Sequence, residues 1–204
     1  MNKIMYPPRP KGSMSHFDLP YYEQTGKWVA QRKFCGSRIL IHVSKDKIVS
    51  SLSRHGAPFA RFMIDKNYSD QLLESLSFES GKDYWLDGEL LNKGFGPKNH
   101  IVIFDLLQAG RYMFGYPNQI SRLKMLYELC NKPTETSENG MSLKISQHFS
   151  LAEVFENEFS TRFQESENVG LIEGLVLRQR ETPLDNFGSK PYETTAQIRC
   201  RKPI

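Results

Sequence analysis

A lysine, a glycine and an arginine stand close together in the stretch AQRKFCGSRILIHV, residues 30–43. Lys33 precedes Gly36 by three positions and Arg38 by five, where an alternating apolar run begins. A lysine amine can act as a nucleophile, a glycine lets the backbone approach a ligand, and an arginine can bind phosphate oxygens through two donors. A lysine at a strand edge is usually only solvated surface, so its role depends on what else the chain carries.

Four further stretches carry charged residues within apolar text. They are WLDGELL with Asp87 and Glu89, IFDLL with Asp105, IEGLVLR with Glu173 and Arg178, and IRCRK with Arg199 and Arg201. Each alone is typical of an edge-strand charge. Taken together, carboxylates and cations that alternate out of a sheet face indicate a cleft suited to a phosphate ester and its metal ion.

The elements that position these residues can be read from periodicity. Alternating runs predict strands at 27–34, 37–43, 48–54, 83–91, 100–107, 143–149, 172–180 and 194–202. Helical spacing predicts helices over 58–76, 118–130 and 151–166. Because there is no internal repeat and no strict βαβ alternation, we expect one α+β domain over residues 1–204, with mainly antiparallel β-sheets flanked by helices. Residues 1–24, rich in proline, glycine and tyrosine, are expected to form an extended lead-in.

Composition limits the setting but not the chemistry. The chain has 204 residues, is 39% hydrophobic and carries a net charge of +4, which permits a polyanionic partner without demanding one. Its three cysteines are scattered, no CxxC pair occurs, and the histidines show no metal-ligand spacing. No stretch has the length of a signal peptide core or a membrane span. We therefore expect an intracellular protein, cytoplasmic or nuclear, with no membrane partner.

The ordered series KFCGSR, SRHG, WLDGELL, IVIFDLL, EGLVLR and IRCRK resembles the motifs of the covalent nucleotidyltransferase superfamily. That superfamily holds ATP-dependent DNA ligases, RNA ligases and mRNA capping guanylyltransferases. The match runs from about Gln31 to Lys202 and looks most like the adenylation domain of ATP-dependent DNA ligases. The resemblance implies that Lys33 is the nucleophile and that Gly36 lets the backbone approach the nucleotide.

The resemblance also assigns roles to the other residues. It implies that Arg38 and Glu89 bind the ribose, that Phe104 stacks on the base, and that Glu173 holds the catalytic metal. Gln31 lies where the family probes the base, and a glutamine amide can both donate and accept, so it does not exclude guanine. Arg54 of SRHG matches a contact to the nucleic-acid backbone. Two lysines of the family's last motif are replaced here by Arg199 and Arg201, with Lys202 brought in if the register slips by one residue.

The reaction implied by the resemblance has three steps and needs ATP and Mg²⁺. Lys33 attacks the α-phosphate to form a lysyl-AMP intermediate, AMP passes to a 5′-phosphate end, and a 3′-hydroxyl then seals the nick. The expected substrate is nicked double-stranded DNA, with RNA as an open alternative. An RNA ligase, a guanylyltransferase on the same fold, and an inactive relative that only binds nucleotide or nucleic acid also remain open.

Two departures from the family pattern bear on activity. Cys35 stands where the family has an aspartate in KxDGxR, so the chain lacks a carboxylate that would orient the lysine, the metal or a sugar hydroxyl. Most ligases and capping enzymes also carry an OB-fold domain after the last motif, whereas this sequence ends at Ile204. We therefore expect either an isolated catalytic domain or a protein that borrows an OB-fold partner.

Overall fold

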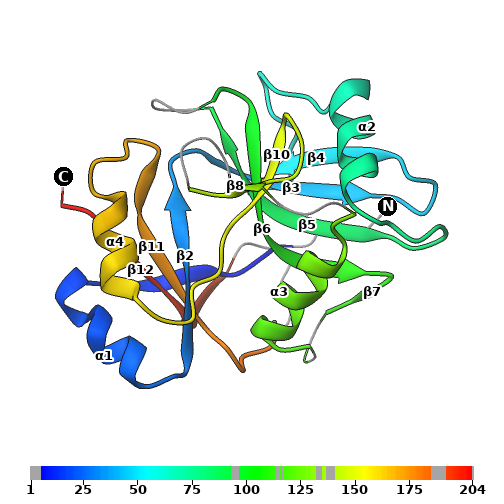
Figure 1. Cartoon of the computed structure of the whole chain (residues 1–204). Helices are drawn as coiled ribbons and strands as arrows, with labels where there is room; N and C mark the ends of the chain where they lie inside the picture. The colour runs from blue at the N-terminus through cyan, green and yellow to red at the C-terminus, as the bar shows by residue number, and fades with distance from the viewer. Residues whose placement is uncertain are drawn as a thin grey trace.

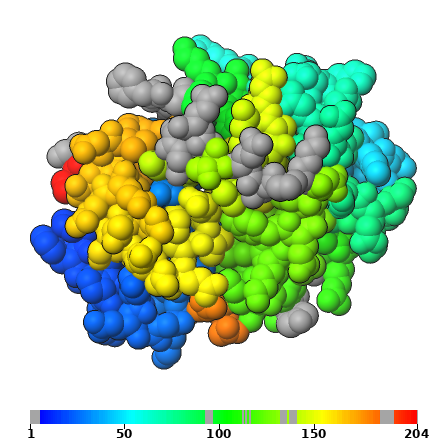
Figure 2. All heavy atoms as spheres, in the orientation of Figure 1, coloured from blue at the N-terminus to red at the C-terminus, as the bar shows by residue number. Residues whose placement is uncertain are grey.

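A computed structural model describes residues 6–92, 97–113, 115, 117–131, 135–136, 141–184 and 192–203. These residues form two β-sheets with helices packed against them (Figure 1). The first and last parts of the chain make up one half of the molecule and the middle part makes up the other (Figure 2). The expected α+β architecture is confirmed.

The smaller sheet joins the two ends of the sequence in the order β1-β12-β11-β2. Its strands are β1 (Arg9–Met14), β2 (Trp28–Phe34), β11 (Ile172–Gln179) and β12 (Glu193–Arg201). β11 runs antiparallel to both β2 and β12, whereas β1 pairs with β12 in parallel. The expected lead-in thus contains a sheet strand, followed by a 3-10 turn (His16–Asp18) and helix α1 (Leu19–Gln24).

The larger sheet has the order β4-β3-β5-β6-β10-β9-β8, with β7 paired to β6. Its main strands are β3 (Ser37–Val43), β4 (Val49–Ser53), β5 (Tyr84–Leu91) and β6 (His100–Ala109). The shorter strands are β7 (Arg111–Tyr112), β8 (Glu135–Thr136), β9 (Leu143–Lys144) and β10 (Phe149–Leu151). The pairing is antiparallel except between β10 and β6. The single strand expected over 143–149 is wrong, because the chain turns back between β9 and β10.

Three longer helices cover the sheets, namely α2 (Lys66–Ser75), α3 (Gln119–Glu128) and α4 (Phe159–Ser166). The helix expected over 118–130 is confirmed, and the Asn118 side chain caps it by accepting from the Ser121 N–H at 3.0 Å. The helix expected over 58–76 begins only at Lys66, because Asp65 caps it there. Within the described residues, no helix is long and apolar enough to cross a bilayer.

The helix expected over 151–166 is wrong in its first half. Phe155 exchanges two backbone hydrogen bonds of 2.8 Å with Ala30 of β2, so this segment is extended and the helix starts at Phe159. Phe155 still packs with Phe159 and Phe163 in the apolar cluster beneath the smaller sheet. A larger cluster fills the space between the eight-stranded sheet and helices α2 and α3. Each sheet therefore has its own core, and the strands that carry the candidate site face one another.

Candidate active site

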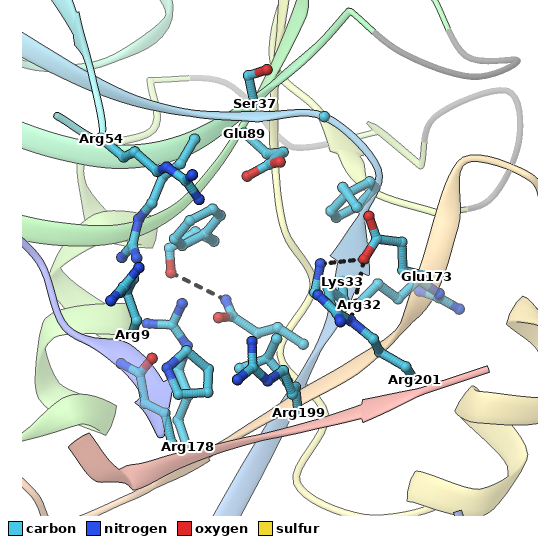
Figure 3. A pocket seen from close by; sticks show the side chains of 18 of the residues that line it. Arg9, Arg32, Lys33, Ser37, Arg54, Glu89, Glu173, Arg178, Arg199 and Arg201 are labelled. Atoms are coloured by element: carbon cyan, nitrogen blue, oxygen red, sulfur yellow. Dashed lines mark hydrogen bonds and ion pairs between the residues drawn. The ribbon is translucent and has the colours of Figure 1, made fainter. Parts of the chain in front are cut away.

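A cleft of about 490 Å³ opens between the two sheets, and strands from both sheets line it. All but one of the side chains predicted from the sequence meet there. They are Gln31, Lys33, Gly36, Arg38, Arg54, Glu89, Phe104, Glu173, Arg199 and Arg201. Figure 3 shows most of their side chains directed into one space from opposite walls. The structure thus brings together residues that are scattered along nearly the whole chain.

Lys33 and Glu173 form an ion pair on one wall of the cleft. The distance from Lys33 Nζ to Glu173 Oε2 is 2.5 Å, and Arg201 Nε lies 3.6 Å from the same oxygen (Figure 3). The register between β11 and β2 shifts between Ile172 and Gly174, which is the pattern of a β-bulge. A bulge can redirect one side chain, and here it brings the Glu173 carboxylate to the lysine.

Gly174 makes this bulge possible. Its φ is +136°, and a Cβ added to it would lie 2.1 Å from the Cys200 carbonyl oxygen. Gly36 has a similar steric requirement, since a Cβ there would lie 2.4 Å from the Leu90 carbonyl oxygen of β5. Both glycines therefore allow close contact between backbones beside the nucleophile. For Gly36, the neighbouring backbone belongs to the strand that carries Glu89.

Arg38 is fixed by a buried carboxylate next to it. Its Nε donates to Asp87 Oδ1 at 2.8 Å, its Nη2 donates to Asp87 Oδ2, and its Nη1 donates to the Pro8 carbonyl at 3.0 Å. Burial raises the pKa of the nearby Glu89 to about 7, against the opposing effect of the charges on Lys33 and Arg38. The cleft therefore contains a carboxyl group that titrates near neutral pH.

Two guanidinium groups lie near the ring of Phe104, and an amide contacts its backbone carbonyl. Arg178 Cζ is 5.1 Å and Arg38 Cζ is 5.7 Å from the ring centroid. Gln31 is buried, and its Nε2 donates to the Phe104 carbonyl at 3.2 Å. Its Oε1 is buried and accepts no hydrogen bond from the described part of the chain. An unpaired buried acceptor is costly, so this oxygen favours a ligand that donates to it.

Arg178 is held by a buried charge network behind the cleft. Its Nη1 lies 2.9 Å from Asp105 Oδ2, and Arg122 of α3 donates to the same carboxylate. Burial opposes ionisation of Asp105, but the charges of Arg122 and Arg178 outweigh it and hold the pKa of Asp105 below its usual value. Asp105 thus supports the wall of the cleft from behind rather than facing it.

Comparison with solved structures shows which fold this chain has. The structure of a mycobacterial DNA ligase D complexed with ATP and MES matches with a TM-score of 0.61 at 17% identity, over 98% of this chain and 61% of that one. The ligase domain from M. tuberculosis LigD matches with a TM-score of 0.58 at 16% identity, over 95% of this chain and 59% of that one. The chain has the fold of a DNA ligase adenylation domain.

The ATP-dependent DNA ligase from bacteriophage T7, in complex with ATP, has the same fold, with a TM-score of 0.54 at 12% identity over 98% of this chain and 70% of that one. No family model and no curated protein matches the sequence. The chain spans less than two thirds of each mycobacterial structure, 61% and 59%. At these identities the comparisons establish the adenylation fold, and the chemistry has to be argued from the side chains.

Lys202 is the predicted residue that the adenylation fold does not bring into the cleft. Its Nζ donates to the carbonyls of Ser166, Glu167 and Val169 at 2.9, 3.3 and 3.0 Å. It therefore caps the end of α4, where ammonium groups are favoured. The register of β12 places Arg199 and Arg201 in the cleft, whereas Lys202 does not line it, and the nucleotide contact expected of Lys202 stays a prediction.

Three arginines in the cleft are not among the predicted site residues, namely Arg9, Arg32 and Arg178. Arg32 is already held by two carboxylates, those of Glu153 and Glu165. The sequence marks Arg178 only as a strand charge, although its place at the end of EGLVLR is a usable signal. Arg9 was placed in the lead-in, and only the pairing of β1 with β12 shows that it reaches the cleft. Cys35 lies beside Lys33 but does not line the cleft, and its backbone N–H donates to the Leu171 carbonyl at 2.8 Å.

The donor set of the cleft suits Mg²⁺ better than a metal that needs a full protein cage. Within the described part of the chain, no three histidine, cysteine or acidic side chains gather as a ligand set. Mg²⁺ usually takes one or two carboxylates and completes its shell with water and substrate phosphates. Glu173 can supply such a carboxylate at the end of the cleft where Lys33 lies.

Proposed function

We propose that this chain is the adenylation domain of an ATP-dependent polynucleotide ligase that acts on nicked DNA. The observation that carries the proposal is the contact between Lys33 Nζ and Glu173 Oε2 in a cleft that Arg199 and Arg201 also line. A nucleophile, an acidic group and phosphate-binding cations are what transfer of a nucleotide to an amine requires.

In the first step, Lys33 Nζ attacks the α-phosphorus of ATP. A P–N bond forms while the P–O bond to pyrophosphate breaks, and the amine gives up a proton. Glu173 Oε2, at 2.5 Å from Nζ, is placed to receive that proton or to orient the amine. Arg199 and Arg201 offer forked donors to the phosphate oxygens as negative charge shifts to the leaving group. Mg²⁺ bound at Glu173 would supply further neutralisation of the phosphate charge.

In the next two steps the same cleft serves the nucleic acid. The 5′-phosphate of the nick attacks the phosphorus of lysyl-AMP and releases Lys33, and the 3′-hydroxyl then displaces AMP. Arg54 directly follows β4 and lines the cleft. There it can contact the phosphodiester backbone without reading sequence. Nicked DNA is the proposed partner because the matched structures are DNA ligases.

We favour ATP over GTP because two of the matched ligase structures are complexes with ATP, and the Gln31 amide is compatible with adenine. Nε2 is used by the Phe104 carbonyl, so only the buried Oε1 is left to accept from a base that reaches it. The exocyclic amine of adenine can donate to it, whereas the O6 atom of guanine is itself an acceptor and would repel it.

The test uses ATP and GTP labelled at the α-phosphate, with Mg²⁺, followed by denaturing electrophoresis. Acid-labile label on the chain with ATP supports the proposal, and label with GTP alone points to the capping reaction. No label with either nucleotide favours a relative that binds without reacting. Nicked DNA and nicked RNA duplexes then rank the two substrates.

An intracellular location remains a prediction, based on the three cysteines that the structure leaves free.

A further inference from the structure

Arg9 reaches the cleft from a strand outside the predicted motifs. Arg9 begins β1, which pairs in parallel with β12 and sets Arg9 opposite Glu193. Pro8 and Pro10 flank it, and proline restricts both its own φ angle and the residue before it. The backbone that carries the Arg9 side chain is therefore fixed before any ligand binds.

The guanidinium of Arg9 is poorly satisfied within the protein. Its Nε is buried and has no hydrogen-bond partner among the residues that the structure describes. Its Nη2 lies 3.5 Å from Glu193 Oε1, and the two side chains are 42% and 48% exposed. An exposed pair at this distance contributes little. The exposed part of the Arg9 side chain is thus weakly committed within the protein and can bind a ligand in the cleft.

Arg9 also adds charge to a wall that is already cationic. Arg38 and Arg178 on the same wall each have a buried carboxylate partner, Asp87 and Asp105 respectively. The neighbouring backbone is tied to the site, because the Pro8 carbonyl accepts from Arg38 Nη1 at 3.0 Å.

Arg54 continues this wall and has no carboxylate partner among the described residues. Its Nε donates instead to His55 Nε2 at 3.0 Å. Figure 3 shows Arg9 next to Arg54 and Arg178, across the cleft from Glu173. Two guanidinium groups without buried counter-charges on one wall favour an anionic ligand.

We propose that Arg9 binds a phosphate group in the cleft, a role that rests on the proposed ligase function. Two phosphates share the required chemistry, the polyphosphate of the nucleotide and the 5′-phosphate of the nicked strand. A guanidinium binds either through paired donors, whereas a carboxamide cannot replace its charge. Equilibrium binding, which needs no covalent step, separates this inference from the proposed reaction.

The nucleotide arm compares adenosine, AMP and ATP binding to the wild-type chain and to Arg9→Gln by titration calorimetry. Removal of one charge-assisted contact should weaken phosphate binding about tenfold. If Arg9→Gln loses affinity for ATP but not for adenosine, the bound phosphate belongs to the nucleotide. The result with AMP shows whether it is the α-phosphate.

The nucleic-acid arm compares nicked duplexes that carry a 5′-phosphate or a 5′-hydroxyl. If Arg9→Gln loses affinity only for the nick with a 5′-phosphate, the bound phosphate belongs to the nucleic acid. Lys11→Gln removes a charge from the same strand at an exposed residue outside the cleft and should change neither arm. Glu193→Gln removes the partner of Arg9 and should leave phosphate binding unchanged or tighter.

Three results overturn the proposal. The first is that Arg9→Gln binds every ligand with the affinity of the wild type. The second is that its affinity for adenosine and for the 5′-hydroxyl nick falls as much as its affinity for their phosphorylated counterparts. The third is that Glu193→Gln weakens phosphate binding as much as Arg9→Gln does, because Arg9 would then matter only as a structural partner of Glu193. A wild-type chain that binds these ligands but forms no lysine adduct contradicts the proposed function and leaves the Arg9 result standing by itself.

Discussion

Lys33 Nζ and Glu173 Oε2 lie 2.5 Å apart although 140 positions separate them in the sequence. Two antiparallel strands, β2 and β11, bring them together, and the bulge at Gly174 directs the carboxylate to the amine. Such a contact between an amine and an acid would be an ordinary surface ion pair elsewhere. Here it lies in a cleft lined by further arginines, two of which, Arg54 and Arg199, have no carboxylate partner among the described residues, and this setting supports a catalytic role.

The bulge at Gly174 predicts a large stability cost for a single methyl group. Gly174→Ala places a Cβ 2.1 Å from the Cys200 carbonyl and holds a φ of +136°, so it should lower the free energy of unfolding by about 3 kcal/mol. Denaturant unfolding measures this. Gly12→Ala is the matched control, because a Cβ there has no atom within 4 Å, and it should change stability by less than about 1 kcal/mol. Equal effects of the two substitutions would contradict the steric argument.

The raised pKa of Glu89 predicts a pH-dependent first step. Below about 7 the carboxyl is mostly neutral and cannot accept from two ribose hydroxyls, and above that pH it is ionised. Adduct formation should therefore rise about tenfold between pH 6 and pH 8. Glu89→Gln should remove this rise and leave any slope that comes from other groups. An unchanged pH profile in Glu89→Gln would show that this carboxyl does not control the step.

The buried Asp105 predicts a strong effect on folding. Asp105→Asn leaves Arg122 and Arg178 without their shared counter-charge and should cost about 3–5 kcal/mol of unfolding free energy. Because the pKa of Asp105 is lower in the folded chain than its usual 3.8, its contribution is present above that pH and is lost as the pH falls below it. The free energies of unfolding of the wild type and Asp105→Asn should therefore differ most at neutral pH and converge as the pH falls below 3.8. Asp70→Asn, at an exposed ion pair, is the control and should have little effect.

Cys35 predicts a slow step that a carboxylate would accelerate. Cys35→Asp restores the residue type of the related motif beside Lys33, and outer-shell groups of this kind typically change rates about 10- to 100-fold. Single-turnover measurements of adduct formation, AMP transfer and sealing locate the affected step. A Cys35→Asp chain that is no faster in any of the three would mean that the thiol carries no penalty.

The strands of the site could be predicted because alternation of apolar residues is a local signal. That signal placed Lys33, Glu89 and Glu173 on strands and gave the α+β class. The extended segment around Phe155 could not be found this way, because two backbone hydrogen bonds to Ala30 override a helical spacing of aromatic side chains. Strand residues in register were predictable, and segments fixed by distant partners were not.

Arg9 and Lys202 show the same limit within the site. Arg9 enters the cleft through parallel pairing between the two ends of the chain, which no spacing in the sequence reports. Lys202 leaves it because three carbonyls at the end of α4 bind its ammonium. Charge and strand position alone did not decide which cations face the cleft.

The central claim is that the amine of Lys33 becomes bonded to phosphorus. The direct measurement is incubation of the chain with ATP and Mg²⁺, followed by peptide mass spectrometry to locate the added AMP. We predict the adduct on the peptide that contains Lys33, with none formed by Lys33→Arg and normal formation by Lys27→Arg. An adduct on another residue, an adduct that persists in Lys33→Arg, or no adduct in the wild-type chain would contradict the account.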